Sequence, residues 1–312
     1  MTKILLTGGC GFIGSNLGPL LIDQGFEVTI LDNFSKGDIS YLPKHDQFEI
    51  IEADIGDEEA VYNAAKGKDA VIHLAALGSV VESVVNPNDN FISNAEGTFK
   101  VLNAARRAGI KRCVFASTGG AIMGNTPPPV NETSLPKPIS PYGASKLAGE
   151  GYCSAFSHAY DMNITALRFA NVIGPISAHK KGAITVFIRA LMNNKPITIF
   201  GDGKATRDFL FVKDLCKGIV SALIKNKPGF NVYHLASGEE VSVKQLAKTL
   251  CEVAEKPDHE IRFESKRKGE VERNFADYKK AKEELGFLPS FTLDEALKIT
   301  WNWFLEHEGP ES

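Results

Sequence analysis

Three features that the chain lacks exclude several classes of protein. It has no apolar run long enough to span a membrane, and its first residues have the pattern of a β-strand, not a signal peptide. Its charge is nearly balanced, with 35 basic and 38 acidic residues, which argues against nucleic acid or an anionic membrane as the main partner. We therefore expect a cytoplasmic protein that acts on a small molecule.

Cysteine is also scarce, and its spacing is irregular. The five cysteines are odd in number and widely separated, which predicts reduced thiols and no disulfide framework. Neither they nor the seven scattered histidines have the spacing of a metal site, so we expect no metal. At 312 residues, of which 43% are hydrophobic, the chain can bury a large core, and we expect one large domain plus a smaller lobe.

The N-terminal segment predicts dinucleotide binding. The apolar run Lys3–Thr7 has the length of a buried strand and leads into Gly8-Gly9-Cys10-Gly11-Phe12-Ile13-Gly14, which fits G-x-G-x-x-G when counted from Gly9. Apolar residues then recur at helical spacing. Glycines let the backbone turn sharply beside a pyrophosphate, and the helix N-terminus offers N–H groups to its phosphates. The alternative is a glycine-rich loop in an α/β protein that binds another ligand.

A carboxylate stands where the adenosine ribose would lie. The second apolar run, Val28–Leu31, ends at Asp32, which is 18 residues past Gly14. A dinucleotide site carries an acid about 20 residues past the motif, where it accepts hydrogen bonds from ribose hydroxyls and repels a 2′-phosphate. Lys36 is the only nearby cation, so the sequence favours NAD over NADP.

The rest of the chain alternates between strand and helix patterns. This predicts a Rossmann-type, doubly wound parallel sheet with ligands at the carboxyl ends of its strands. Further strands are expected at 48–52, 70–74, 111–116 and 164–169, and helices at 57–67, 89–108 and 142–160. After residue 174 the pattern loosens, so we expect an NAD-binding domain at 1–174 and a smaller α/β substrate lobe at 175–312, partly interleaved with it. In that lobe, helices are expected near 183–193, 213–226, 242–255 and 292–306, and short strands near 197–200, 209–211 and 231–235.

Tyr142 and Lys146 form a candidate acid/base pair. Four residues apart on a helix, their side chains lie on the same face. A phenol normally loses its proton near pH 10, and a neighbouring ammonium should lower that pKa toward neutrality. The spacing alone also occurs on ordinary surface helices, so the prediction depends on the glycine motif as well. The basic pair Lys180 and Lys181 is expected to be solvated.

With these motifs assembled, the chain resembles the extended short-chain dehydrogenases/reductases, specifically the NAD-dependent nucleotide-sugar epimerase/dehydratase family, and within it UDP-glucose 4-epimerases. The resemblance runs to about residue 300. It is carried by Thr7-Gly8-Gly9-Cys10-Gly11-Phe12-Ile13-Gly14, Leu31-Asp32-Asn33, Ala53-Asp54-Ile55, His73-Leu74-Ala75-Ala76, Asn94 with Gly97-Thr98, Ala116-Ser117-Thr118, Tyr142 with Lys146, Arg168-Phe169-Ala170-Asn171, Gly201-Asp202-Gly203 with Arg207-Asp208-Phe209, and Arg267-Lys268-Gly269-Glu270.

The resemblance implies a role for each matching residue. The catalytic group would be Tyr142, Lys146 and Thr118, with Ser117 as the alternative hydroxyl because the following glycine pair blurs the match. The substrate would contact Thr118, Tyr142, Asn171, Arg207, Arg267 and Glu270. The residues that would hold NAD are Gly8, Gly11, Phe12, Ile13, Gly14, Asp32, Asn33, Phe34, Ser35, Lys36, Gly37, Asp54, Ile55, Leu74, Ala75, Ala76, Asn94 (in support), Tyr142, Lys146 and Phe169.

The implied reaction is epimerisation at carbon four of a UDP-sugar through a 4-keto intermediate, as in galactose metabolism. Four positions depart from the family pattern. Met123 replaces the usual Tyr before Gly124, Gly78 replaces a side chain that can touch the site, and Glu270 replaces the more usual Asp. Asn274 stands where a bulky Tyr restricts the sugar pocket, so a smaller residue there resembles enzymes that also accept N-acetylated sugars.

Rival functions stay open at this point. Sugar 4,6-dehydratases place acids after the catalytic hydroxyl, whereas Gly119 and Gly120 follow Thr118 here. The run 171–178 contains no Arg, which makes a uronic-acid substrate less favoured. A nucleotide-sugar reductase and a non-catalytic NAD sensor would share the same fold, but the intact Tyr142, Lys146 and Thr118 argue against the sensor. Family likeness also implies a homodimer through the helices at 89–108 and 141–160, whose apolar faces could equally be internal core.

Overall fold

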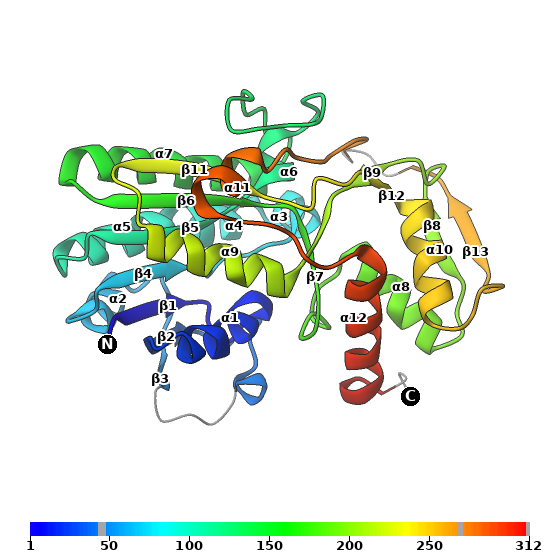
Figure 1. Cartoon of the computed structure of the whole chain (residues 1–312), viewed down its shortest axis with the longest axis horizontal. Coiled ribbons are helices and arrows are strands. Elements are labelled where there is room, and N and C mark those ends of the chain that lie inside the picture. Colours follow the sequence, from blue (N-terminus) through cyan, green and yellow to red (C-terminus); the bar gives the residue numbers. More distant parts are fainter. Residues whose placement is uncertain (43–47, 267–270, 310–312) are drawn as a thin grey trace.

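A computed structural model describes residues 1–42, 48–266 and 271–309, and in this part of the chain seven parallel strands form the main sheet (Figure 1). Their order is β11-β6-β5-β4-β1-β2-β3. The strands are β1 (Lys3–Thr7), β2 (Glu27–Asp32), β3 (Phe48–Glu52), β4 (Ala70–His73), β5 (Arg112–Thr118), β6 (Asn163–Phe169) and β11 (Phe230–Leu235).

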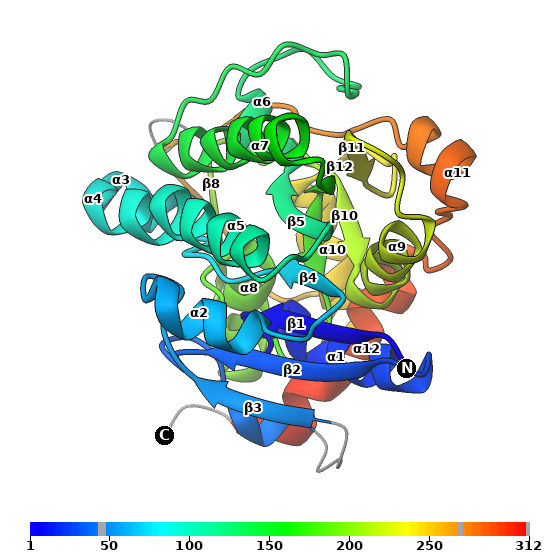
Figure 2. The same ribbon diagram turned by 90° about the vertical axis from the view of Figure 1, so that its left-hand side faces the viewer.

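The strands are apolar on both faces because helices cover both. Ile4 and Leu6 of β1 belong to one core cluster, and Leu5 between them belongs to the other. A continuous apolar run is typical of a parallel strand that is buried on two sides. Figure 2 shows the two helical layers. One contains α1 (Phe12–Asp23) and α9 (Val212–Lys225), and the other contains α2 (Glu58–Ala65), α5 (Gly97–Arg107) and α7 (Pro141–Tyr160). The predicted doubly wound α/β fold is confirmed.

The helix expected at 89–108 is not uniform. It begins as α4 (Pro87–Asn90), continues as the π-helical segment η2 (Phe91–Glu96) and ends as α5. Short helices that the sequence did not predict flank the strand ends: η1 (Ile39–Tyr41), α3 (Val80–Val85) and α6 (Gly119–Met123). Each is too short to show the apolar periodicity on which such predictions depend.

The segment after residue 174 contributes to two parts of the molecule. Strand β11 completes the main sheet beside β6, and α9 packs against α1. The remaining elements form the smaller lobe on the right of Figure 1. They are α8 (Ala183–Met192), β8 (Ile197–Phe200) paired with β13 (Ile261–Glu264), β9 (Thr206–Arg207) paired with β12 (Val241–Ser242), α10 (Val243–Val253) and α12 (Leu293–His307).

Two further pieces join the halves. Strand β7 (Asn171–Ile173) pairs in parallel with β10 (Phe209–Phe211), and α11 (Lys279–Leu285) packs near β11. The boundary between residues 174 and 175 stays a prediction. Among the described residues, no helix combines the length and apolarity that crossing a membrane requires.

Candidate active site

The site lies at the point where the sheet order reverses. The chain runs from β1 to β2 and β3 on one side, then returns to β4 on the other side of β1. Ligands of open α/β sheets bind in the crevice at such a point, outside the carboxyl ends of the strands. Here those ends carry Gly8 after β1 and Ala75 after β4.

The glycine turn is as tight as the motif predicts. Gly8 has φ +72°, and a Cβ there would lie 2.6 Å from the Ala75 nitrogen. A Cβ on Gly14 would lie 2.5 Å from the Gly8 oxygen, so helix α1 packs directly against the turn. Gly11 precedes α1 and has no side chain to cap it. The first amides and positive dipole end of α1, at Phe12 and Ile13, therefore suit a pyrophosphate.

Asp32 connects the glycine turn to the loop that follows β2, where an adenosine ribose would bind. Its carboxylate accepts the amide of Cys10 at 2.9 Å and the amide of Phe34 at 2.9 Å. Each carboxylate oxygen keeps a second lone pair, which could accept a ribose hydroxyl. Phe34 has φ +54°, an uncommon conformation for a residue with a side chain and one that is typical of functional loops. Gly37 lies against Cys10, so this loop is pressed onto the glycine turn.

The other adenosine-side residues lie next to this loop. The Asn33 amide donates to Asp54 at 2.6 Å, and Ser35 donates to the side-chain oxygen of Asn33. Ile55 is buried against Gly97. Lys36 is exposed. On the opposite side of the crevice, the Leu74 amide donates to Thr7, which places the segment that includes Ala76 beside the glycine turn.

The candidate catalytic residues meet at the end of β5. Thr118 is the last residue of β5, and its side chain lies close enough to the Tyr142 phenol of α7 to lower the pKa of that phenol. The Lys146 ammonium, 3% exposed, donates to the Ala116 carbonyl at 2.8 Å. The Ser117 hydroxyl does not face Tyr142. It donates to the buried Glu150 carboxylate at 2.6 Å. The two hydroxyls that the sequence could not distinguish therefore have different partners.

The pKa of Tyr142 corrects one expectation. Burial raises it to about 12, and only the side chain of Thr118 acts in the opposite direction. Burial also lowers the pKa of Lys146 to about 8. Lys146 is not among the groups that shift the pKa of Tyr142 here, and its ammonium is held on the Ala116 carbonyl.

Asn94 supports this arrangement from the π-helical segment. Its amide bonds to both backbone groups of Leu77, at 2.8 and 3.0 Å, and to the Ser145 hydroxyl at 3.3 Å. π-Helical turns frequently occur at functional sites, where they aim a side chain inward. Ser83 of α3 is a support that the sequence did not suggest: its hydroxyl accepts the Tyr142 amide at 3.2 Å.

Backbone hydrogen bonds bring Asn171 and Asn274 next to the segment that contains Arg207. The Asn274 amide donates to the carbonyl of Thr206, the neighbour of Arg207, and its buried side chain lies against Gly120, two residues past Thr118. The Arg207 guanidinium donates to the same Thr206 carbonyl at 2.7 Å. The side-chain amide of Asn171 donates to the Asp208 carbonyl at 3.1 Å. Arg267 and Glu270 lie outside the described residues. Phe169 ends β6 in register with Thr118.

Two of the positions that depart from the family pattern differ in burial. Met123 is fully buried, and a Cβ on Gly78 would meet no atom within 4 Å.

Two carboxylates follow Arg207 in the chain, and both serve the lobe's loops. Asp208 accepts hydrogen bonds from the loop at 237–238, and Asp214 accepts them from the loop at 290–291.

One prediction about the basic pair after His179 is wrong. The Lys180 ammonium lies 4.9 Å from the ring centroid of Phe12, and burial lowers its pKa to about 8. It is therefore placed beside the N-terminus of α1, where a phosphate would lie, and is a cofactor-site candidate that the sequence missed. Lys181 is exposed, as expected, but pairs with Glu82 of α3 at 2.8 Å.

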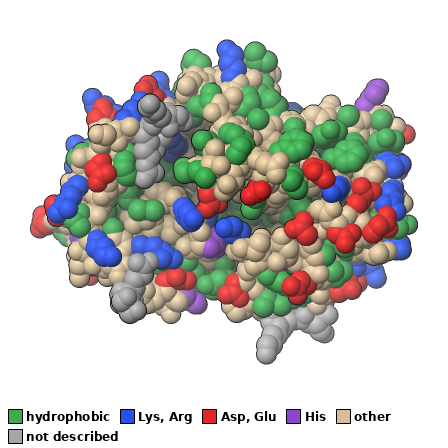
Figure 3. All heavy atoms as spheres, turned by 180° about the vertical axis from the view of Figure 1, so that it is seen from behind, with side chains coloured by type: hydrophobic (Ala, Val, Ile, Leu, Met, Phe, Trp, Pro, Cys, Tyr) green, Lys and Arg blue, Asp and Glu red, His purple; other side chains and the backbone are tan. Residues whose placement is uncertain are grey.

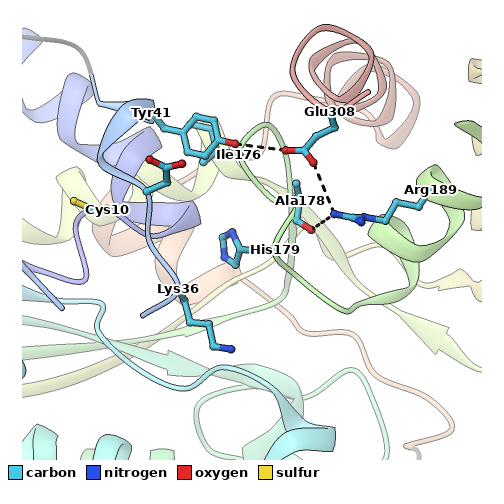
Figure 4. Close-up of a pocket in the computed structure, with 9 residues that line it drawn as sticks. Cys10, Lys36, Tyr41, Ile176, Ala178, His179, Arg189 and Glu308 are labelled. Atoms are coloured by element: carbon cyan, nitrogen blue, oxygen red, sulfur yellow. Dashed lines mark hydrogen bonds and ion pairs between the residues drawn. The ribbon is translucent and has the colours of Figure 1, made fainter. Parts of the chain in front are cut away.

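A cavity of about 270 Å³ adjoins the cofactor loop (Figure 4). It does not include the catalytic residues. In Figure 4 the Tyr41 hydroxyl points toward Glu308, which also faces Arg189. Figure 3 shows the opposite face of the molecule, which is hollowed near its middle, where basic, acidic and histidine side chains gather. The cavity is lined by Cys10, Lys36, Asp38, Tyr41, Ile176, Ala178, His179, Arg189 and Glu308.

Within the described residues, no group of three or more His, Cys, Asp or Glu side chains could hold a metal ion.

The fold and this site define a dinucleotide-binding enzyme of the short-chain dehydrogenase/reductase type. Residues 4–236 match the NAD dependent epimerase/dehydratase family, and the chain belongs to that family. It is 36% identical to the UDP-glucose 4-epimerase of Mycolicibacterium smegmatis, over 97% of this chain and 98% of that one.

Two solved structures are similar over nearly their whole length. The UDP-glucose 4-epimerase of Thermotoga maritima, with UDP-glucose, superposes with a TM-score of 0.93 at 36% identity, covering 98% of this chain and 99% of that one. The UDP-N-acetylglucosamine 4-epimerase of Methanobrevibacter ruminantium, in complex with UDP-N-acetylmuramic acid, gives 0.92 at 32% identity and covers 98% of each chain.

Proposed function

We propose that this chain is an NAD-dependent 4-epimerase of UDP-sugars that interconverts UDP-glucose and UDP-galactose. The observation that carries the proposal is the contact between the Thr118 hydroxyl and the Tyr142 phenol at the carboxyl end of β5, one helical turn from the buried Lys146. An acid/base pair at the crevice of a dinucleotide-binding sheet suits proton removal from an alcohol during hydride transfer.

Tyr142, Thr118 and Lys146 have separate roles in the proposed reaction. Tyr142, as phenolate, removes the proton from the sugar 4-hydroxyl, and Thr118 shares a hydrogen bond with the same oxygen. Bound NAD would supply the hydride acceptor and a positive charge that favours the phenolate against the effect of burial. Thr118 is proposed over Ser117 because the Ser117 hydroxyl already donates to Glu150. Lys146 would hold a ribose hydroxyl of the cofactor.

The nucleotide stays anchored while the 4-keto sugar turns over. Arg207 and the proposed Arg267 would hold the diphosphate, because a guanidinium presents a planar donor fork that matches phosphate oxygens. Asn171 and Glu270 would contact the nucleotide or the sugar nearby. Reduced NAD, when bound, would supply the hydride that returns to the opposite face of the keto carbon, and carbon four would then be inverted.

The sugar pocket favours a broad substrate range. Asn274 is buried beside Gly120 and is smaller than the Tyr that the family pattern places there. We therefore expect UDP-N-acetylglucosamine to be accepted as well. UDP-glucuronate is the second substrate class, and a net nucleotide-sugar reductase is the rival reaction.

A panel of UDP-sugars tests the proposal. Purified protein is incubated with UDP-glucose, UDP-N-acetylglucosamine or UDP-glucuronate, without NADH in one series and with added NADH in a second, and products are identified by proton NMR, because epimers have identical mass. Interconversion without added cofactor supports the epimerase. Stoichiometric consumption of added NADH would support the reductase, and no reaction with any sugar would contradict both.

We also propose a homodimer that acts in the cytoplasm, in galactose metabolism. Apolar side chains are exposed on α3, η2 and α7, among them Val84, Phe91 and Tyr152, and both α3 and η2 contact α7. Neighbouring exposed apolar residues are typical of an interface. Sedimentation equilibrium of the wild-type chain and of Phe91→Glu would test it, with a dimer expected for the first and weakened association for the second.

A further inference from the structure

A buried carboxylate ties the helix of the catalytic pair to the strands beneath it. Glu150 lies one turn past Lys146 and two turns past Tyr142, on the same face of α7. Its side chain is 6% exposed. One of its oxygens accepts the Ser117 hydroxyl at 2.6 Å and the Arg168 Nε at 2.9 Å, and the other accepts the Arg168 Nη2 at 2.8 Å.

These contacts reach the end of β5, where the reaction is proposed to occur. Ser117 and Arg168 are neighbours in register on β5 and β6, and Ser117 directly precedes Thr118. The side chain of Thr118 lies beside the phenol of Tyr142, which is on the same helix as Glu150. The Glu150 carboxylate therefore fixes α7 to the residue of β5 that directly precedes Thr118.

Stability alone does not explain a buried ion pair at this place. Taking both charges out of water opposes their attraction, and apolar residues of similar volume often stabilise a fold equally well. What a bidentate arginine–carboxylate pair does provide is a fixed orientation, because both groups are planar and two parallel bonds must form together. Such a pair restricts how α7 can slide or rotate over β5 and β6.

We propose that Glu150, held by Arg168, is a positioning residue that sets the Tyr142 phenol and the Thr118 hydroxyl at proton-transfer distance. The inference rests on the proposed epimerase function, and Glu150 acts through Ser117 and α7 without touching the sugar. A small displacement of catalytic groups affects the transition state more than the bound ground state. Loss of the carboxylate should therefore lower kcat and leave substrate binding almost unchanged.

The test compares Glu150→Gln with a matched control, Asp214→Asn. Asp214 is an equally buried carboxylate on α9 that accepts hydrogen bonds from Ser290 and Phe291, away from α7. We expect Glu150→Gln to lower kcat about 10²-fold, with KM and the calorimetric Kd of UDP-glucose within about threefold of wild type. Asp214→Asn should lower the thermal midpoint and keep kcat. The thermal midpoint of each variant shows that it is folded at the assay temperature.

Two further variants keep the inference testable if Glu150→Gln does not fold. Arg168→Lys preserves the charge but removes the bidentate geometry, and Ser117→Ala removes one anchor to β5; both should lower kcat with little change in Kd. A kcat close to wild type in all folded variants, or an equal loss in Asp214→Asn, would overturn the positioning role. A wild-type protein that epimerises no UDP-sugar would instead overturn the proposed function.

Discussion

The side chains of Thr118 and Tyr142 lie next to each other, although the two residues are far apart in the chain. Thr118 ends a strand of the sheet and Tyr142 lies in the first turn of the helix that covers that strand, so the contact joins two different layers of the fold. Burial raises the pKa of the phenol to about 12 even though Thr118 acts to lower it. The two hydroxyls are therefore neighbours before any ligand is considered.

Replacing the phenol should abolish turnover without emptying the cofactor site. Removal of one acid/base group typically costs about 10²–10⁴ in rate, so Tyr142→Phe should lose that much activity while NAD remains bound. NMR of the UDP-sugar products gives the rate, and chromatography of denatured protein gives the NAD content. Tyr152→Phe, on the exposed side of the same helix, is the control and should keep full activity. An active Tyr142→Phe enzyme would refute the assignment.

The buried ammonium of Lys146 should reduce stability at neutral pH. Its pKa falls from 10.5 to about 8 on burial, so the folded state loses this proton before the unfolded state does. Below pH 8 the full penalty applies, and it is relieved as pH rises from 8 toward 10.5. Lys146→Met should therefore be more stable than wild type by about 2 kcal/mol at pH 7, after allowing for the lost bond to Ala116.

Urea unfolding at pH 7, 9 and 10.5 measures that difference. It should be largest at pH 7 and should shrink as pH rises, because only the wild-type chain carries the titrating ammonium. A constant difference across the three pH values would show that the lysine is not responsible. The same variant should lose epimerase activity at every pH.

The position of the candidate cofactor site could be predicted from the sequence, because a doubly wound sheet binds its ligands at one edge. Gly8, Asp32, Ala75 and Thr118 each follow or end an apolar strand, and the carboxyl ends of parallel strands meet at one edge of a sheet. No long-range information is needed for that inference. The direction of the Tyr142 pKa could not be obtained in this way, since it depends on burial and on where the Lys146 ammonium points.

Supporting contacts were also beyond the sequence. Ser83 is hydrogen-bonded to Tyr142, which is 59 residues away in the chain, and Glu150 is hydrogen-bonded to Ser117, which is 33 residues away. No sequence pattern around Ser83 or Glu150 indicates these partners. The π-helical turn that contains Asn94 lies within a longer helical pattern, from which the sequence predicts one continuous helix. Lys180 follows a histidine in a polar stretch that gives no sign of its contact with Phe12.

Ser83 should act on catalysis through the backbone of Tyr142. The hydroxyl of Ser83 accepts the Tyr142 amide at 3.2 Å, one of the helix N-terminal amides that has no partner within α7. Ser83→Ala should cost about 1–3 kcal/mol of stability and lower kcat about tenfold, because the phenol is then less well held. Ser79→Ala removes only the cap of α3 and should lower stability by about 1 kcal/mol with kcat unchanged.

Arg207 should matter for binding and not for chemistry. A guanidinium that holds a diphosphate makes the same contact in the ground state and the transition state, so its loss raises KM and leaves kcat nearly constant. Arg207→Ala should raise KM for UDP-glucose by about 10- to 100-fold, and Arg207→Lys by less, because a lysine lacks the planar fork. Arg262→Ala breaks an exposed ion pair with Glu260 and should change neither constant.

Asn274 should determine which sugars enter. Its side chain is buried and lies against Gly120, close to the hydroxyl-bearing turn, so a larger residue there narrows the space beside the sugar. Asn274→Tyr should lower kcat/KM for UDP-N-acetylglucosamine at least about tenfold relative to UDP-glucose, since an N-acetyl group adds volume that the phenol would occupy. Asn274→Gln, which adds one methylene, serves as the matched control and should change the ratio much less. Product analysis by NMR on both substrates gives the ratio directly, and an unchanged ratio in Asn274→Tyr would show that the selectivity is set elsewhere in the lobe.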